Sequence, residues 1–294
     1  MCVGSRPVAG MEIWEAIVVG VVQGLTEFLP ISSSGHIVLT QFLLGTRPFP
    51  EGQDGDVVFE VVLHLGTLLS VVVYFRMRLW HMLHSLWRKD LEEERRWIGL
   101  LALATLPAVV LVMLPAGSTV DAATGESHKR TLGDLFERAY DNPVLVSSLL
   151  IVTGALLFAP RFLRMKSKDL GWRGALAMGL GQGLAILPGI SRSGASITAG
   201  LMAGVDPRKA AEFSFLMSIP AIAGAVVFKL REFIERFQGD LLVPYLVGAV
   251  SSFIVGIFAV AVVMGAIKKG RFQYFAYYCF VAGITGIIYF STRG

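Results

Sequence analysis

Charged residues and cysteines are both scarce in this 294-residue chain, and each shortage excludes a class of protein. Only 16% of the residues are charged, whereas a soluble domain usually carries about a quarter. The two cysteines, Cys2 and Cys279, lie at opposite ends of the chain, so they form neither a disulfide framework nor a metal-ligand motif. The net charge of +4 is small and gathers at the ends of apolar blocks, which argues against a nucleic-acid partner.

Long apolar blocks take the place of the missing charge. Apolar residues make up 54% of the chain, and six blocks reach the roughly 20 helical residues that cross a bilayer. Because these blocks are apolar on every face, a large soluble core is the weaker interpretation. The sequence therefore predicts an all-α polytopic membrane protein in contact with membrane lipids. Its six transmembrane helices are 57–75, 97–114, 144–163, 210–227, 241–267 and 272–290.

Two further apolar regions are interrupted in the middle. Region 13–45 is broken at 29–36, and region 174–205 is broken at 187–194, each time by proline, glycine and serine. Proline and glycine end helices, and a serine-rich break exposes backbone groups that hydrocarbon cannot satisfy. Such backbone is tolerated at membrane depth only inside protein or beside a wet cavity. Both regions therefore predict re-entrant helix–loop–helix hairpins.

The two interrupted regions also resemble each other. Shifted by 159 positions without a gap, seven of the thirteen positions from Gln23 to Gly35 are identical to those that start at Gln182. We interpret 1–10 as a leader and 11–294 as one membrane domain with two halves, 11–163 and 172–294. Three predicted spans separate the hairpins, so they enter the membrane from opposite faces. This is an inverted-topology repeat, which places sites near the midplane.

The basic residues predict an orientation for the chain. Sixteen Lys and Arg residues fall on the face that holds Arg78 and Lys209, and nine fall on the other. The positive-inside rule then puts the first face in the cytoplasm and both termini outside. Of the 26 basic residues, only Arg192 lies within a predicted intramembrane break.

Arg192 is the first candidate site residue, because a charge at that depth faces the protein interior or a cavity. A guanidinium matches phosphate oxygens as a fork, and the helix predicted to start near Ser193 offers free N–H groups. The second hairpin thus predicts an anion site, most naturally for phosphate. A structural pairing of Arg192 with a buried acid is the alternative.

The first hairpin supplies complementary groups. Glu27 precedes the break at Pro30, and Ser32, Ser33, Ser34 and His36 follow it. A carboxylate, a hydroxyl and an imidazole so close together can provide a base, a nucleophile and an acid for phosphoryl transfer. Glu27 could equally hold a divalent cation, and the serines could be no more than helix caps. We expect the two hairpins to face each other across one site.

Three other polar groups in predicted spans are second-tier candidates. Glu60 and Glu212 each lie near the start of a span, where stabilisation of a helix N-terminus explains them equally well. His64 lies one turn after Glu60 and could be its hydrogen-bond partner.

At this point a family resemblance becomes clear. Residues 23–36 (QGLTEFLPISSSGH) resemble the first signature of the bacterial undecaprenyl-diphosphate phosphatases of the bacitracin-resistance type. Residues 188–196 (PGISRSGAS) resemble their second signature, and 59–61 and 211–215 fit further family blocks. The resemblance extends from about Met11 to the C-terminus.

The resemblance implies hydrolysis of undecaprenyl diphosphate to undecaprenyl phosphate, which recycles the carrier lipid for cell-wall synthesis and confers bacitracin resistance. It also implies a bacterial plasma-membrane location, a site open to the outer face and a divalent cation, Mg²⁺ or Ca²⁺. The catalytic set that it implies is Glu27, Ser33, His36 and Arg192, with Ser32, Ser191, Ser193, Ser196 and Gln23 at the phosphates.

Two positions depart from the family pattern. Gln23 stands where many members have a glutamate, which puts a two-carboxylate metal site in doubt, and Ser196 replaces a threonine but keeps the hydroxyl. The nucleophile stays open between Ser33, His36 and water. The rival function is a lipid or small-molecule transporter or flippase, because inverted repeats with broken helices are a transporter architecture. A homodimer through Gly248, Gly256 and Gly265 stays open, since contacts within one chain also explain these glycines.

Overall fold

Helices form almost all of the computed structural model, which describes residues 11–44, 55–88, 90–120, 127–132, 142–162, 167–237 and 239–292. The predicted leader, 1–10, lies outside these residues. The first half holds α1 (Ile13–Phe28), α2 (Ser33–Leu44), α3 (Gly55–Tyr74), α4 (Arg76–His84), α5 (Glu92–Met113), α7 (Pro143–Phe158) and η2 (Ala159–Phe162). The second holds α8 (Trp172–Leu184), α9 (Arg192–Met202), α10 (Pro207–Phe228), α11 (Leu230–Arg236), η3 (Gly239–Leu241), α12 (Leu242–Lys268) and α13 (Tyr274–Ser291).

The six predicted spans coincide with α3, α5, α7, α10, α12 and α13. Within the described residues, five helices are long and apolar enough to cross a membrane. A sixth span is obtained if α3 and α4, which are bent by 74° at their junction, are counted together. The prediction of a helical membrane protein is therefore confirmed, and the predicted number of six spans is reached when α3 and α4 are counted together.

The outer face of α12 shows why this chain belongs in a bilayer. Val250, Ile254 and Phe258 recur at helical spacing and are 54%, 60% and 63% exposed. The buried face of the same helix includes several small residues, among them Gly248 and Ser252. Apolar residues outside and small residues at helix contacts are the pattern of a helix surrounded by lipid.

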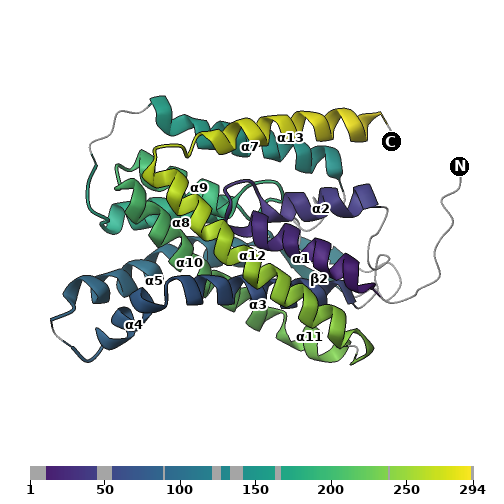
Figure 1. Cartoon of the computed structure of the whole chain (residues 1–294), viewed down its shortest axis with the longest axis horizontal. Helices are drawn as coiled ribbons and strands as arrows, with labels where there is room; N and C mark the ends of the chain where they lie inside the picture. The colour runs from purple at the N-terminus through teal and green to yellow at the C-terminus, as the bar shows by residue number, and fades with distance from the viewer. Residues whose placement is uncertain are drawn as a thin grey trace, which may run out of the picture.

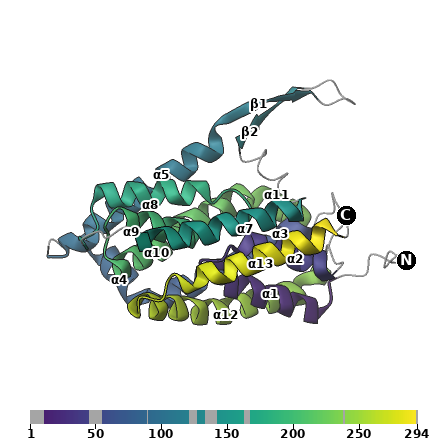
Figure 2. The ribbon, with the colours of Figure 1, turned by 90° about the horizontal axis from the view of Figure 1, so that it is seen from above.

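The helices lie side by side in one bundle, and α13 runs along α7 (Figure 1). A single two-stranded hairpin departs from the helical pattern. Strands β1 (Pro115–Val120) and β2 (Ser127–Thr131) pair antiparallel, with Thr119 opposite His128. This hairpin projects away from the helices (Figure 2). The sequence did not predict these strands, because they are short and lack the apolar alternation that marks a buried sheet.

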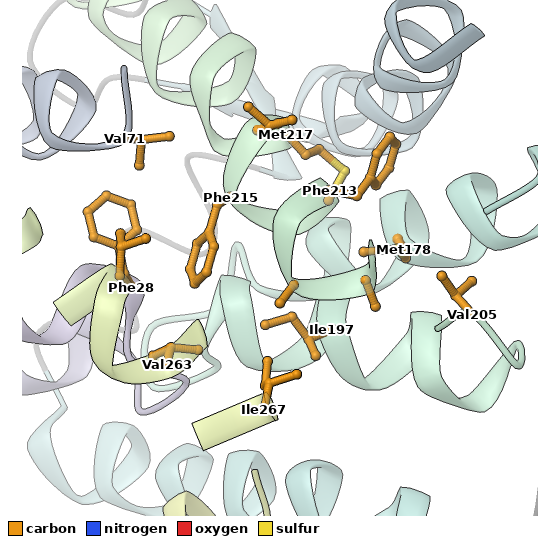
Figure 3. Packing of buried hydrophobic residues seen from close by; sticks show 14 of the residues in the cluster. Phe28, Val71, Met178, Ile197, Val205, Phe213, Phe215, Met217, Val263 and Ile267 are labelled. Atoms are coloured by element: carbon orange, nitrogen blue, oxygen red, sulfur yellow. The ribbon is translucent and has the colours of Figure 1, made fainter. Parts of the chain in front are cut away.

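The apolar core lies beside the two interrupted regions (Figure 3). Phe28, the last residue of α1, packs edge-on against Phe215 of α10, with ring centroids 5.8 Å apart. Ile197 of α9 and Val263 of α12 belong to the same buried cluster. The core thus joins the end of α1 to the start of α9, and it fixes the two breaks relative to each other.

An ion-pair network holds one end of the bundle together. Arg78 pairs with Glu212, and Asp169 binds both Arg96 and Lys209, the latter at 2.7 Å. The hydrogen bond from Lys209 is the main cause that lowers the pKa of Asp169 to about 2. A lowered carboxyl pKa stabilises the fold above its ordinary value near 4 and ceases to do so as the pH falls toward 2. The Asp169 carboxylate is therefore ionised at neutral pH.

Close helix packing makes Gly24 of α1 sensitive to substitution. A Cβ atom at Gly24 would lie 2.5 Å from the carbonyl oxygen of Ser252 on α12. We expect Gly24→Ala to destabilise the protein by about 1–3 kcal/mol, because a well-packed contact would have to open. Gly265→Ala on α12 is the matched control, since nothing lies within 4 Å of its Cβ position. Thermal unfolding in detergent measures both, and equal melting temperatures would contradict the expectation.

The other glycines considered for a dimer contact are explained within the chain. A Cβ at Gly248 would meet the ring of Phe59, and one at Gly256 would meet Ser70. Both glycines therefore serve helix packing inside one molecule.

Candidate active site

The first break begins where α1 ends at Phe28. Leu29 is extended, and Ser32 adopts the left-handed region with a φ of 71°, so the chain turns back before α2 starts at Ser33. The Ser32 side chain accepts a hydrogen bond from the backbone N–H of Gly35 at 3.3 Å. The Pro30 region thus ends one helix and Ser32 caps the next, as the sequence predicts.

The second break has the same local design. α8 ends at Leu184, Gly189 has a φ of 101°, and α9 starts at Arg192. Ser191 caps α9 by accepting a hydrogen bond from the N–H of Gly194 at 3.1 Å. Gly189 is needed for a second reason, because a Cβ there would lie 2.6 Å from the carbonyl oxygen of Val146.

Matching residues of the two breaks make matching hydrogen bonds. Ser32 and Ser191 are 159 positions apart, as are the two glycines that they cap. The hydroxyl pairs Ser32–Ser34 and Ser191–Ser193 are likewise equivalent, and each pair is separated by 3.3 Å. The similar segments therefore share their caps and hydroxyl contacts at matching positions.

The two breaks touch each other. The Ser193 hydroxyl donates to the carbonyl oxygen of Leu29 at 3.3 Å. A Cβ at Gly35 would lie 3.3 Å from the Cα of Gly189. On the far side, Thr153 of α7 donates to the carbonyl of Gly189 and accepts from the N–H of Ser191. The two breaks are therefore in contact, and a shared functional site between them stays a prediction.

Glu27 is the centre of this meeting point. Its Oε1 accepts from a guanidinium N–H of Arg192, which comes from the other break. Its Oε2 accepts from the Ser33 hydroxyl at 2.6 Å and from the Gln23 amide at 3.1 Å. The Nε2 of His64 lies 3.9 Å from the same oxygen. A buried carboxylate stays ionised only with such partners, and this one is 5% exposed.

The arrangement places reactive groups beside a cationic anchor. The Ser33 hydroxyl is in direct contact with a carboxylate that can accept its proton, which is the relation of a nucleophile to its base. Arg192 is 26% exposed at its side chain, so it is within reach of a ligand. The structure shows the alternative for Arg192, a pairing with a buried acid, and that acid is the predicted catalytic carboxylate Glu27. A phosphate site at Arg192 stays a prediction.

Comparison with known proteins places the chain in a family. The family model described as bacitracin resistance protein BacA matches residues 16–285. This chain belongs to the BacA family. The relative named undecaprenyl-diphosphatase from Desulforapulum autotrophicum is 39% identical, over 95% of this chain and 98% of its own length. The relative of the same name from Salinibacter ruber is 36% identical, over 94% of this chain and 99% of its own length. The one from Korarchaeum cryptofilum is 37% identical, over 93% of this chain and 98% of its own length.

Within this BacA-family site, His36 is turned away from the Glu27 cluster. Its Nδ1 lies 2.7 Å from the carbonyl oxygen of Ser32, and its Nε2 lies 2.8 Å from the hydroxyl of Tyr278 on α13. In the part of the chain that the structure describes, no hydrogen bond joins His36 to Ser33. Tyr278 was missed by sequence reasoning, because nothing distinguishes it from the other tyrosines of an apolar span.

Ser196 lies deeper than the other candidates. Its hydroxyl is completely buried and bonds to the carbonyl of Arg192 at 2.8 Å and to the Ser214 hydroxyl at 2.6 Å. The structure therefore directs Ser196 toward α10 rather than toward the Arg192 guanidinium. Its role at the phosphates stays a prediction.

The second-tier candidates separate into two groups. Glu60 accepts a hydrogen bond from Lys229 at 3.1 Å, and Glu212 pairs with Arg78, so both carboxylates are engaged away from Glu27. His64 bonds to the backbone carbonyl of Glu60 through Nδ1 and not to its carboxylate. Its other nitrogen faces Glu27, which makes His64 the one second-tier residue beside the cluster.

A divalent cation would meet two protein oxygen donors at this site, Gln23 and Glu27. Among the described residues, no three His, Cys, Asp or Glu side chains form a metal cluster. The Oε1 of Gln23 is buried without a hydrogen-bond partner, next to the Glu27 carboxylate. Both are hard oxygen donors, and Mg²⁺ commonly takes one or two protein ligands and completes its shell with phosphate oxygens and water.

Proposed function

We propose that this chain hydrolyses undecaprenyl diphosphate to undecaprenyl phosphate and inorganic phosphate. The observation that carries the proposal is the contact of Glu27 with both Arg192 and Ser33. Arg192 belongs to the second break, 165 residues from Glu27, and Ser33 belongs to the first break, 6 residues from Glu27. The relatives named undecaprenyl-diphosphatase match over nearly the whole chain, and the family name accounts for bacitracin resistance. The product is the carrier lipid reused in cell-wall synthesis.

Arg192 is the anchor for the diphosphate in this mechanism. Its planar guanidinium suits two phosphate oxygens, and the first turn of α9 adds N–H groups and a partial positive charge. Ser191 and Ser193 flank Arg192 and provide hydroxyl donors to the same anion. These fixed donors stabilise the charge that develops on the terminal phosphoryl group, and such stabilisation accounts for most of the rate acceleration in phosphoryl transfer.

Ser33 is the nucleophile that the geometry supports best. Its Oγ attacks the terminal phosphorus while its proton passes to Oε2 of Glu27, 2.6 Å away. The bond between phosphorus and the bridging oxygen breaks, and undecaprenyl phosphate leaves with that electron pair. Water then attacks the phosphorylated serine, Glu27 again supports the proton transfer, and inorganic phosphate is released with Ser33 restored.

Gln23 and Glu27 are the residues that would hold a divalent cation. Such a cation would neutralise part of the charge of the diphosphate. We expect chelation with EDTA to lower phosphate release by at least about tenfold, since electrostatic stabilisation of the transferred group would be weakened. Titration of Mg²⁺ and Ca²⁺ back into the chelated protein measures the effect. Unchanged activity after chelation would remove the cation from the proposal.

The two interrupted regions are proposed as re-entrant hairpins of an inverted repeat. Reciprocal packing between the halves supports this arrangement: α1 packs on α12 of the second half, and α8 packs on α5 of the first. The close contacts of Gly20 with Gly248 and of Gly179 with Ala104 are 159 positions apart in α1 and α8. Such a repeat brings both breaks to a common depth.

The location that we propose is the bacterial plasma membrane, with both termini outside and the site open to the outer face. Arg78 pairs with Glu212, and Arg96 and Lys209 both pair with Asp169. These ion pairs support a common face for the three basic residues, as the positive-inside argument requires. Cysteine labelling at each terminus with a membrane-impermeant reagent tests this orientation.

The decisive test of function is phosphate release from a short isoprenyl diphosphate by purified protein in detergent. We expect release by the wild type and at least a hundredfold less by Glu27→Gln, because the base and the partner of Arg192 are both lost. Glu94→Gln is the matched control, since Glu94 pairs with Arg78 at the ion-pair network. No release under varied cations would favour the rival function, a transporter or flippase, which broken helices also serve.

A further inference from the structure

The last helix, α13, reaches the first break with two adjacent residues. The Tyr278 hydroxyl lies 2.8 Å from Nε2 of His36, and Cys279 Sγ lies 3.8 Å from the carbonyl oxygen of Pro30. The rings of Tyr278 and His36 also stack, with centroids 5.5 Å apart and planes 16° from parallel. A helix from the end of the chain is therefore docked on the segment that carries Ser33.

The hydrogen bonds of His36 define its tautomer. The carbonyl oxygen of Ser32 can only accept, so Nδ1, 2.7 Å away, must carry a proton. In the neutral ring Nε2 then has the lone pair and accepts from the Tyr278 hydroxyl. A phenol can also reverse its role and accept from an imidazolium, so the contact persists when His36 gains a proton.

We propose that Tyr278 is a positioning residue: its hydroxyl, bound to Nε2, fixes the ring orientation of His36, whose Nδ1–H is held by Ser32, and Nε2 is the one ring atom that exchanges a proton during turnover. The proposal rests on the proposed phosphatase activity and adds a positioning residue to it. Glu27 serves Ser33 directly, whereas His36 lies one helical turn further along α2. Its Nε2 gains a proton when the Tyr278 hydroxyl turns and becomes the acceptor of the hydrogen bond.

The hydroxyl of Tyr278, rather than its ring, makes the contact specific. Docking of α13 on the break is also supported by Cys279, which is completely buried. Tyr278→Phe keeps the stacked ring and the helix contact and removes only the hydrogen bond to Nε2. Tyr277→Phe is a matched control, because Tyr277 packs its ring on Phe158 and is 46% exposed.

Steady-state kinetics with a short isoprenyl diphosphate test the proposal first. We expect Tyr278→Phe to lower kcat about tenfold with KM changed less than about twofold, the size of one lost hydrogen bond to a reacting group. Tyr277→Phe is expected to match the wild type. In a His36→Gln background Tyr278→Phe is expected to add no further loss, because the ring that it positions is gone.

A second measurement does not depend on turnover. Nitrogen-15 spectra of the histidine-labelled protein report the tautomer, and His36→Gln identifies the His36 signals among the five histidines. We expect the Nδ1–H tautomer in both proteins, because Ser32 holds the Nδ1 proton, and a shifted Nε2 signal in Tyr278→Phe, because that nitrogen loses its hydrogen-bond donor. An unchanged Nε2 signal, or independent and additive losses in the double variant, would overturn the proposal. Failure of the proposed phosphatase activity would look different from failure of the Tyr278 proposal, because the wild type itself would then release no phosphate.

Discussion

Arg192→Ala is expected to lower phosphate release by about 1,000-fold, the range seen when an arginine that stabilises a transferred phosphoryl group is removed. The physical reason is that Arg192 is the one arginine or lysine inside either break, so no other guanidinium or ammonium group of the described site can anchor the diphosphate. Arg192→Lys is expected to be more active than Arg192→Ala but less active than the wild type, because an ammonium group keeps the charge but cannot donate two parallel hydrogen bonds to phosphate oxygens. Phosphate release from a short isoprenyl diphosphate measures both variants.

Stability must be controlled in this experiment, because Arg192→Ala leaves Glu27 unpaired. Removing one partner of a buried ion pair typically costs about 3–5 kcal/mol, and the partial exposure of Arg192 reduces that figure here. Arg78→Ala is the matched control, since it also removes a guanidinium that faces carboxylates, Glu94 and Glu212. We expect Arg78→Ala to keep most of the activity. If Arg192→Ala kept more than about a tenth of it, Arg192 would not be the anchor.

Ser33→Ala should abolish the covalent step and lower phosphate release by about 1,000-fold, as expected when an activated nucleophile is removed. Ser34→Ala is a close control, because Ser34 is the next residue and its hydroxyl faces Ser32 rather than Glu27. We expect it to stay within about threefold of the wild type, the size of one weak hydrogen bond. The contrast between two neighbouring serines isolates the contact with Glu27.

Trapping of a phosphorylated protein distinguishes the three nucleophiles between which the sequence could not decide: Ser33, His36 and water. With a label on the terminal phosphate, acid quenching should leave label on wild-type protein and none on Ser33→Ala. Label that survives in Ser33→Ala but not in His36→Gln would assign the nucleophile to His36. Absence of label in the wild type, together with an active Ser33→Ala, would show direct attack by water.

The activity losses expected for Ser33→Ala and Arg192→Ala each depend on a contact with Glu27. The sequence could predict one of these contacts more directly than the other. The contact of Ser33 with Glu27 spans 6 residues. Pro30 and the serines after it predicted the end of one helix and the cap of the next. The contact of Arg192 with Glu27 spans 165 residues. It could be predicted only through the repeated motif, which indicated that the two breaks are equivalent and face each other.

The sequence by itself determined the spans, the two breaks and the family, because hydropathy, proline and serine act locally and act the same way in any fold. It also singled out Arg192, since a charge in an apolar segment is costly wherever it lies. The similarity of the breaks was legible too, and their matching caps at Ser32 and Ser191 follow from it.

Only the tertiary structure decided which way the side chains point and what they meet. It turned His36 toward Tyr278, 242 residues away, turned Ser196 toward Ser214, and brought His64 to Glu27. These partners depend on helix rotation and on packing between distant segments, and neither leaves a local pattern in the chain. The spans were therefore legible from one sequence, while the partners inside the site required the fold.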